Sequence, residues 1–321
     1  MRTAAPPIPT AARPRTRRAL LPAALLAALI ASAGCGGGGG GGGLTAPGGT
    51  PSSGPGTVQL LDATTGTLGS PTLDGATFDA RGALAPHALS FREVLASSSV
   101  QGAVPGSLGA QSDEPRHVAS VGVYYLSCFE LTQGQWTALA TRAGLTGADL
   151  APWQAVGSPG VVGAPPDDPD RAASGLSYDV VQAMIAGYNA AAPAGQPTLR
   201  LPTDSEWEHA ARAASTARFS WGETEDPTTV GTFAVVRESR VGLGADLVGG
   251  SGGTTRQPNA FGFFDMAGNV WEWTQSSGPD ATMRGGSWND NLLAARCADK
   301  QTMDRTLGYA TAGVRLVVVM P

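Results

Sequence analysis

Residues 259–274 of the chain read NAFGFFDMAGNVWEWT, and residues 284–288 read RGGSW. Tryptophan is rare in this chain, yet Trp271, Trp273 and Trp288 lie in this stretch among glycines. Large aromatic rings beside glycines indicate side chains packed where the backbone turns sharply or passes close to another segment. We therefore expect this stretch to form the buried centre of a domain.

Carboxylates at both ends of a tight loop give the same stretch a chemical interpretation. Asp265 and Glu272 supply hard oxygen ligands, and Gly268 and Asn269 between them allow a loop whose carbonyls point inward. Calcium accepts such oxygen ligands in flexible geometry, so a calcium site is one hypothesis. The alternative is that Glu272 hydrogen-bonds to backbone inside a tryptophan-rich core.

Several short sequence motifs elsewhere in the chain accompany this stretch. They are Glu130-Leu131-Thr132 followed by Trp136, the sequence LPTDSEWE at 201–208, AAR at 210–212 and GVR at 313–315. Together with the central stretch, they resemble the formylglycine-generating enzyme, or sulfatase-modifying factor, family over about residues 88–321. The resemblance implies an α+β fold similar to C-type lectins, rich in loops with short helices and strands, and with bound calcium. By the same resemblance, one calcium site would be formed by Asp265, Gly268, Val270 and Glu272.

The active site of these enzymes depends on two cysteines that hold copper after the GGS word. Copper(I) prefers soft thiolates, and a pair of them leaves room for a substrate thiol. At the matching positions this chain has Asp290 and, at about the second position, Ala295, whereas Cys297 fits a later position outside the pair. The resemblance therefore implies the fold without the copper site.

The pocket of the family can nevertheless persist without its copper. Candidate pocket residues are Arg284, Ser287, Trp288, Asn289, Asp290 and Arg296, and Ser287 matches a serine of the family's active site. In the alternative interpretation both arginines are structural ion-pair partners and the serine satisfies a turn.

The remaining cysteines and histidines limit other chemistry. If the protein is exported, Cys128 and Cys297 are expected to form a disulfide, the alternative being two buried free thiols. His87, His117 and His209 are isolated in the sequence, so a histidine-based metal centre is difficult to assemble. Iron is left open because a partner protein could supply ligands.

The N-terminal region predicts export and a membrane anchor. Residues 1–35 have an arginine-rich start, a short apolar run and small residues before Cys35, which is typical of a signal peptide with a lipobox-like cysteine. Residues 36–56 are a tether rich in glycine, proline and serine. Residues 57–87 are a weakly patterned lead-in, and residues 88–321 form the family-like domain. We thus expect a lipoprotein of the bacterial cell envelope, with Cys35 carrying the lipid.

Local signals within the domain predict individual elements. Thr132 and Ser177 are expected helix N-caps, and Thr203 with Glu206 form a capping box at a third helix start. Residues 58–62, 77–79, 91–95 and 118–126 are predicted to form strands.

Overall composition and the motifs leave two functional hypotheses. The 321 residues carry a net charge of −5 and no basic patch, which argues against a nucleic-acid partner. The first hypothesis is a membrane-tethered, non-oxidase binding or structural module with a protein or peptide partner. The second is a metal-dependent oxidoreductase of the same superfamily, acting on a peptide or small molecule without the cysteine pair.

Overall fold

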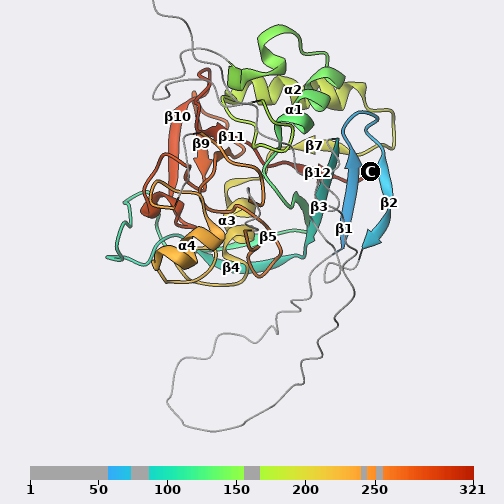
Figure 1. Cartoon of the computed structure of the whole chain (residues 1–321). Helices are drawn as coiled ribbons and strands as arrows, with labels where there is room; N and C mark the ends of the chain where they lie inside the picture. Colours follow the sequence, from blue (N-terminus) through green and yellow to red (C-terminus); the bar gives the residue numbers. More distant parts are fainter. Residues whose placement is uncertain (1–56, 74–86, 155–166, 240–243, 251–255) are drawn as a thin grey trace, which may run out of the picture. The chain divides into compact units, whose positions relative to one another are not determined.

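The computed structural model describes residues 57–73, 87–154, 167–239, 244–250 and 256–321 (Figure 1). The chain divides into two compact units, Met1–Pro51 and Ser52–Pro321, and all described residues belong to the second. The predicted signal peptide with Cys35, the tether and the strand expected at 77–79 lie outside the described residues. None of the described helices is both long and apolar enough to span a membrane.

A six-stranded antiparallel sheet is the largest layer, with the strand order β2-β1-β3-β6-β12-β7. Its strands are β1 Val58–Asp62, β2 Leu68–Leu73, β3 Ala88–Val94, β6 Tyr124–Ser127, β7 Thr198–Arg200 and β12 Val317–Val319. The described first part of the weakly patterned lead-in, residues 57–73, is thus part of the main sheet, because β1 pairs along its length with β3 and β2 pairs with β1.

Two smaller sheets complete the strands of the described residues. The first has the order β10-β9-β8-β11, and the second is a ribbon of β4 and β5. Their strands are β4 Ser97–Gln101, β5 His117–Val121, β8 Trp271–Trp273, β9 Asp280–Arg284, β10 Lys300–Asp304 and β11 Ala312–Gly313. The single strand predicted over residues 118–126 is wrong: Gly122 and Val123 separate β5 in the ribbon from β6 in the large sheet.

The helices begin where their capping residues predict. They are α1 Gln133–Arg142, α2 Tyr178–Ala191, α3 Asp204–Arg212 and α4 Pro227–Phe233, with 3-10 helices η1 Gly147–Leu150, η2 Pro152–Gln154 and η3 Leu292–Ala295. Thr132, Ser177 and Thr203 are the N-caps of α1, α2 and α3. In the capping box of α3, Glu206 N–H donates to the Thr203 hydroxyl at 3.2 Å and Thr203 N–H donates to the Glu206 carboxylate at 2.8 Å.

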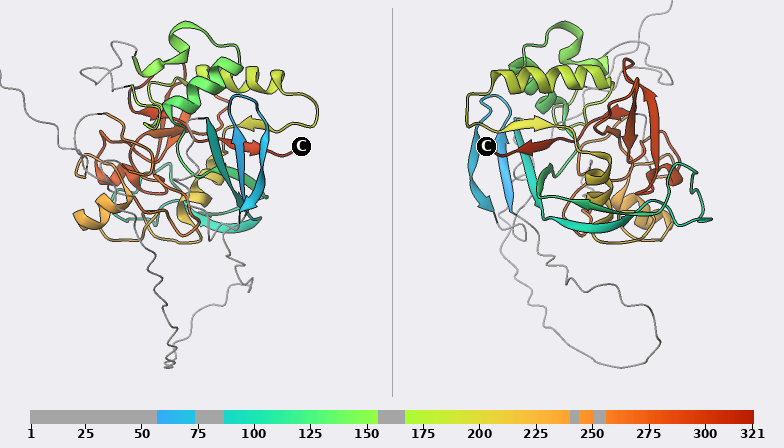
Figure 2. Two further views of the ribbon diagram at one scale, coloured as in Figure 1. Left: turned by 45° about the vertical axis from the view of Figure 1, so that its right-hand side comes forward. Right: turned by 180° about the vertical axis from the view of Figure 1, so that it is seen from behind.

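The helices and sheets share an aromatic core. Helices α1 and α2 pack against each other, and α2 also packs on β7, while α3 contacts the β4–β5 ribbon and β9 (Figure 1). In both views of Figure 2, the blue strands β1 and β2 lie on one side, and the orange-to-red strands β9 and β10 lie on the opposite side. Trp136, Trp207 and Trp273 are fully buried between these elements. This α+β, loop-rich arrangement is the fold class that the sequence predicts.

Candidate functional site

The stretch 259–288 forms the buried centre that its sequence predicts, with Phe263, Met266 and Trp273 at most 2% exposed. The Asn259 side chain fixes its start by donating to the Ala210 carbonyl at 2.7 Å. This bond ties the loop to the C-terminal half of α3.

A second close approach fixes the loop at Gly268. Its φ is +73°, and a Cβ there would lie 2.2 Å from the Val235 carbonyl oxygen. Only glycine tolerates both this backbone conformation and this close approach.

Asp265 is held by an arginine from the same region of the chain. Its carboxylate accepts hydrogen bonds from the Arg256 guanidinium and the Gly249 N–H. Arg256 also pairs with Asp246 at 3.0 Å and donates to the Leu247 carbonyl at 2.6 Å. Burial opposes the charge of Arg256, but the two carboxylates raise its pKa above the ordinary value. Arg256 therefore joins the 244–250 loop to the central stretch.

Glu272 is part of a second buried ion pair. Its carboxylate accepts from Arg315 Nη2 at 2.9 Å and from the Trp207 indole N–H at 2.6 Å. Arg315 also donates to the carbonyls of Ser127 and Phe264, each at 2.8 Å. Both the glutamate and the arginine are 0% exposed, so the pair is fully removed from water.

Glu130, which the sequence did not single out as a site residue, is the third buried carboxylate here. It accepts from the Asn269 side chain and from the Val270 N–H at 3.0 Å. Burial, and then the nearby charges of Asp265 and Glu272, raise its pKa well above the ordinary value. In the sequence, only its position in the Glu-Leu-Thr motif pointed to Glu130.

The predicted calcium ligands therefore lie near one another but are already engaged. Asp265 is paired with Arg256 and Glu272 with Arg315, and the described ranges contain no group of three or more His, Cys, Asp or Glu placed to hold a metal ion. As these side chains lie, they do not fit calcium unless Arg256 leaves Asp265 and Arg315 leaves Glu272. Calcium at this loop stays a prediction, which thermal unfolding with added calcium and with chelator would test.

Arg284 lies in a separate ion-pair network beneath α3. It pairs with Asp204 and, at 3.1 Å, with Glu208, and it donates to the carbonyls of Cys297 and Ala298. Burial opposes its charge, but the two carboxylates raise its pKa. Arg284 is thus an ion-pair partner within the fold, and its role in a pocket stays a prediction.

Arg296 has a similar role on the neighbouring segment. It pairs with Glu114 at 2.7 Å and Asp299 at 2.8 Å, and it donates to the Leu293 carbonyl. Of the six candidate pocket residues, Arg296 also lines one of the clefts described below.

Ser287 and Asp290 do come together. The Asp290 carboxylate accepts from the Ser287 hydroxyl and, at 2.8 Å, from the Trp271 indole N–H. The Asn289 carbonyl accepts from Arg237, and Trp288 packs in a cluster that includes Cys128. The serine is 0% exposed, so this trio closes a turn within the fold.

A cleft lies beside the segment that follows Asp290. It has a volume of about 350 Å³, and its walls include Leu108, Leu292, Leu293, Glu225 and Glu238. A neighbouring cleft of about 470 Å³ shares Leu108 and Glu225 with it and reaches Arg296. The region thus offers an apolar surface bordered by carboxylates.

The disulfide predicted between Cys128 and Cys297 is wrong. Both are free, buried thiols. They lie in different clusters, Cys128 beside Phe129 and Val270 and Cys297 beside Trp207. Burial raises the pKa of Cys128, and it raises that of Cys297 to about 12. Sequence separation gave no information on which cluster each thiol would enter.

The isolated His209 packs as its sequence context predicts. It is 3% exposed, and its ring nitrogens hydrogen-bond to the hydroxyls of Ser97 and Ser99 at 3.0 and 2.8 Å. Burial lowers its pKa.

Comparisons with known proteins agree with this fold. A family model described as "Sulfatase-modifying factor enzyme 1-like domain" matches residues 95–320. The chain is 41% identical over 117 residues to the formylglycine-generating enzyme of Mycobacterium tuberculosis, covering 34% of this chain and 35% of that protein. It is 33% identical over 102 residues to "Inactive C-alpha-formylglycine-generating enzyme 2" of Mus musculus, covering 28% and 32%. The matches thus span about a third of the length of these relatives.

Solved structures show the same architecture at low identity. PvdO from Pseudomonas aeruginosa has a TM-score of 0.60 and 20% identity, covering 72% of this chain and 94% of that chain. Treponema denticola variable protein 1 has a TM-score of 0.57 and 18% identity, covering 73% and 96%. These likenesses bear on the fold alone.

Proposed function

Because the chain belongs to the family of sulfatase-modifying factor enzyme 1-like domains, we propose that it is an exported, membrane-tethered binding or structural module. In this proposal the chain keeps the family fold and lacks its copper-dependent oxidase chemistry. The observation that carries it is the environment of Asp290 and Ala295.

Neither of these residues offers a soft ligand. Asp290 presents a hard carboxylate that already accepts from Ser287 and Trp271. Ala295 is 1% exposed and packs with Val230 and Ala234. Because copper(I) prefers thiolates, the residues present do not fit it.

The thiols elsewhere do not replace the missing pair. Cys128 and Cys297 are buried in separate clusters, and their raised pKa values keep them protonated at neutral pH. A protonated, buried thiol is a poor nucleophile and a poor metal ligand.

A binding role is supported by the apolar cleft beside residues 291–293. Leu108, 62% exposed, lines this cleft together with Leu292 and Leu293. The relative "Inactive C-alpha-formylglycine-generating enzyme 2" of Mus musculus offers a precedent for a protein of this family without formylglycine-generating activity.

A turnover assay tests the proposal. The purified chain is supplied with copper(I), air and a cysteine-containing peptide, and mass spectrometry follows conversion of cysteine to formylglycine. We expect no conversion above that of copper alone. The matched variants are Ala295→Cys, which adds one thiol, and Asp290→Cys/Ala295→Cys, which adds two. Conversion by the wild-type chain, in proportion to enzyme concentration, would contradict the proposal and favour the oxidoreductase hypothesis.

The membrane tether rests on Cys35 and is tested separately. We expect metabolic labelling with a fatty acid to mark the wild-type chain and not Cys35→Ser, and the variant to leave the membrane fraction. Equal labelling of both would rule out lipidation at this cysteine.

A further inference from the structure

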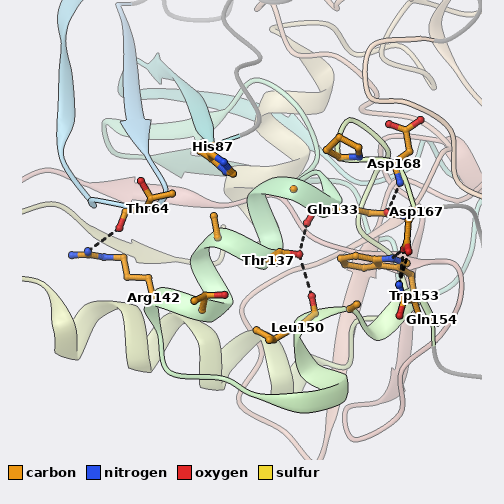
Figure 3. Close-up of a pocket in the computed structure, with 15 residues that line it drawn as sticks. Thr64, His87, Gln133, Thr137, Arg142, Leu150, Trp153, Gln154, Asp167 and Asp168 are labelled. Carbon is orange, nitrogen blue, oxygen red and sulfur yellow. Dashed lines mark hydrogen bonds between the residues drawn. The ribbon is translucent and has the colours of Figure 1, made fainter.

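A groove of about 770 Å³ runs along the solvent-facing side of α1, away from the site described above (Figure 3). Its floor consists of small side chains on that helix face, Gly134, Thr137, Ala138 and Thr141. Thr137 does not project into the groove as a free donor, because its hydroxyl donates to the Gln133 carbonyl at 2.9 Å. A floor of this kind lets an extended backbone approach closely.

At one end of the groove lies Arg142, whose positive charge is not paired with a carboxylate among the described residues. Arg142 Nη1 donates to the Thr64 carbonyl at 3.3 Å, and the guanidinium lies 5.3 Å from the centre of the Tyr188 ring. Its Nε is buried without a hydrogen-bond partner, and no carboxylate of the described residues pairs with it. The guanidinium is thus held in place while much of its capacity to donate is unused.

The other end carries a carboxylate that is oriented but has no cationic partner in the part of the chain that the structure describes. Asp167 accepts from the Trp153 indole N–H at 2.8 Å and from the Gln154 side chain at 2.7 and 2.8 Å (Figure 3). These bonds lower its pKa, Gln154 contributing most. Asp168 adds a second carboxylate, and its distance from Arg171 is 4.0 Å.

We infer that this groove binds an extended segment of a partner polypeptide that places an acidic side chain against Arg142 and a basic side chain against Asp167 and Asp168. The charges at the two ends are opposite: Arg142 is the last residue of α1, and Asp168 N–H donates to Gln133 at its first turn at 3.0 Å. From Gln133 to Arg142 the helix rises about 13 Å, which an extended chain spans with about four residues. The partner segment therefore has its acidic and basic residues about four positions apart.

Two peptides of identical composition test the spacing. Ac-Asp-Ala-Ser-Ala-Lys-NH₂ carries its charges four positions apart, and Ac-Ala-Asp-Lys-Ser-Ala-NH₂ carries them side by side. Binding to the purified full chain is followed by NMR through the Trp153 indole N–H, which donates to Asp167 and is assigned with Trp153→Phe. We expect the first peptide to shift this resonance and to bind about tenfold more tightly than the second.

Variants of the protein test which of its side chains recognise the two charges of the peptide. We expect Arg142→Gln/Asp167→Asn to abolish the difference between the peptides. The matched control Arg116→Gln/Asp113→Asn removes one exposed charge of each sign outside the groove and should preserve it. Circular dichroism confirms that each variant is folded.

Charge reversal gives a positive readout that misfolding cannot imitate. Arg142→Glu should prefer a peptide in which lysine replaces the aspartate. Equal binding of the two first peptides, no shift at millimolar peptide, or undiminished discrimination in the Arg142→Gln/Asp167→Asn variant would overturn the inference. None of these outcomes depends on copper or turnover, so the inference and the proposed function can fail independently.

Discussion

Buried arginines join separate segments of the chain through ion pairs with carboxylates. The members of this set are Arg256, Arg284, Arg296 and Arg315, each at most 4% exposed and each paired with at least one carboxylate. A buried pair of this kind gains little over an apolar pair, yet removing one partner leaves an uncompensated charge. The loops of the protein thus depend on both partners being present.

For Arg315 we expect a large and asymmetric effect. Arg315→Met should lower the free energy of unfolding by about 3–5 kcal/mol, because Glu272 is left buried without its cation. Glu272→Leu/Arg315→Met should recover most of that loss. Urea denaturation measures both, with Arg305→Met at an exposed pair as the control, expected to cost about 1 kcal/mol or less. A loss below that of the control would contradict the account.

Asp299 should make stability depend on pH. Burial, and then the charge of Glu114, raise its pKa from 3.8 to about 7 despite Arg296. Between these values the folded protein retains a proton that the unfolded chain releases, so this contribution to stability falls as the pH rises. Relative to Asp299→Asn, the wild-type free energy of unfolding should fall by at most about 1.4 kcal/mol per pH unit. Urea denaturation at several pH values between 4 and 7 checks the sign, and a relative rise would contradict it.

At the scale of elements, the central loop depends on backbone approach more than on side chains. Val235 and Gly268 form a β-bridge, and the Asn269 N–H donates to the Val235 carbonyl at 2.7 Å. The bridge brings the segment after α4 against the loop that precedes β8. Any Cβ at the glycine would separate the two.

Substituting two glycines that have the same backbone conformation distinguishes the cost of backbone strain from the cost of steric overlap. Gly106 has a φ of +77° with open space around it, whereas Gly268 has a φ of +73° against the Val235 carbonyl. We expect Gly106→Ala to cost about 1 kcal/mol and Gly268→Ala about 3 kcal/mol or more. Thermal unfolding ranks the two, and equal losses would show that the close approach is not rigid.

Elements set by local signals were predictable from the sequence, and long-range partners were not. Thr203 and Glu206 are three residues apart, so their capping box is visible in the sequence. Glu114 and Arg296 are 182 residues apart, and nothing local to either indicates the other. The same limit explains the wrong disulfide, because hydrophobic packing assigned Cys128 and Cys297 to different clusters. Asp290 was found by its place after the GGS word, but its partner Trp271 was not.

At the scale of the whole molecule, the described residues keep the family's architecture, and the segment around Ser287 and Asp290 is held by structural contacts. Ser287, Asp290 and Trp271 satisfy one another, and both nearby arginines are paired. The described residues also form open surfaces, among them the cleft beside residues 291–293 and the groove along α1.

The most direct test of this account is the copper(I) stoichiometry of the purified chain, measured without oxygen against a competing chelator. We predict no stoichiometric copper in the wild-type protein, because Asp290 and Ala295 supply no thiolate and Cys128 and Cys297 are buried apart. We predict about one equivalent in Asp290→Cys/Ala295→Cys, which restores two thiols. One equivalent of tightly bound copper in the wild-type chain would contradict the central claim.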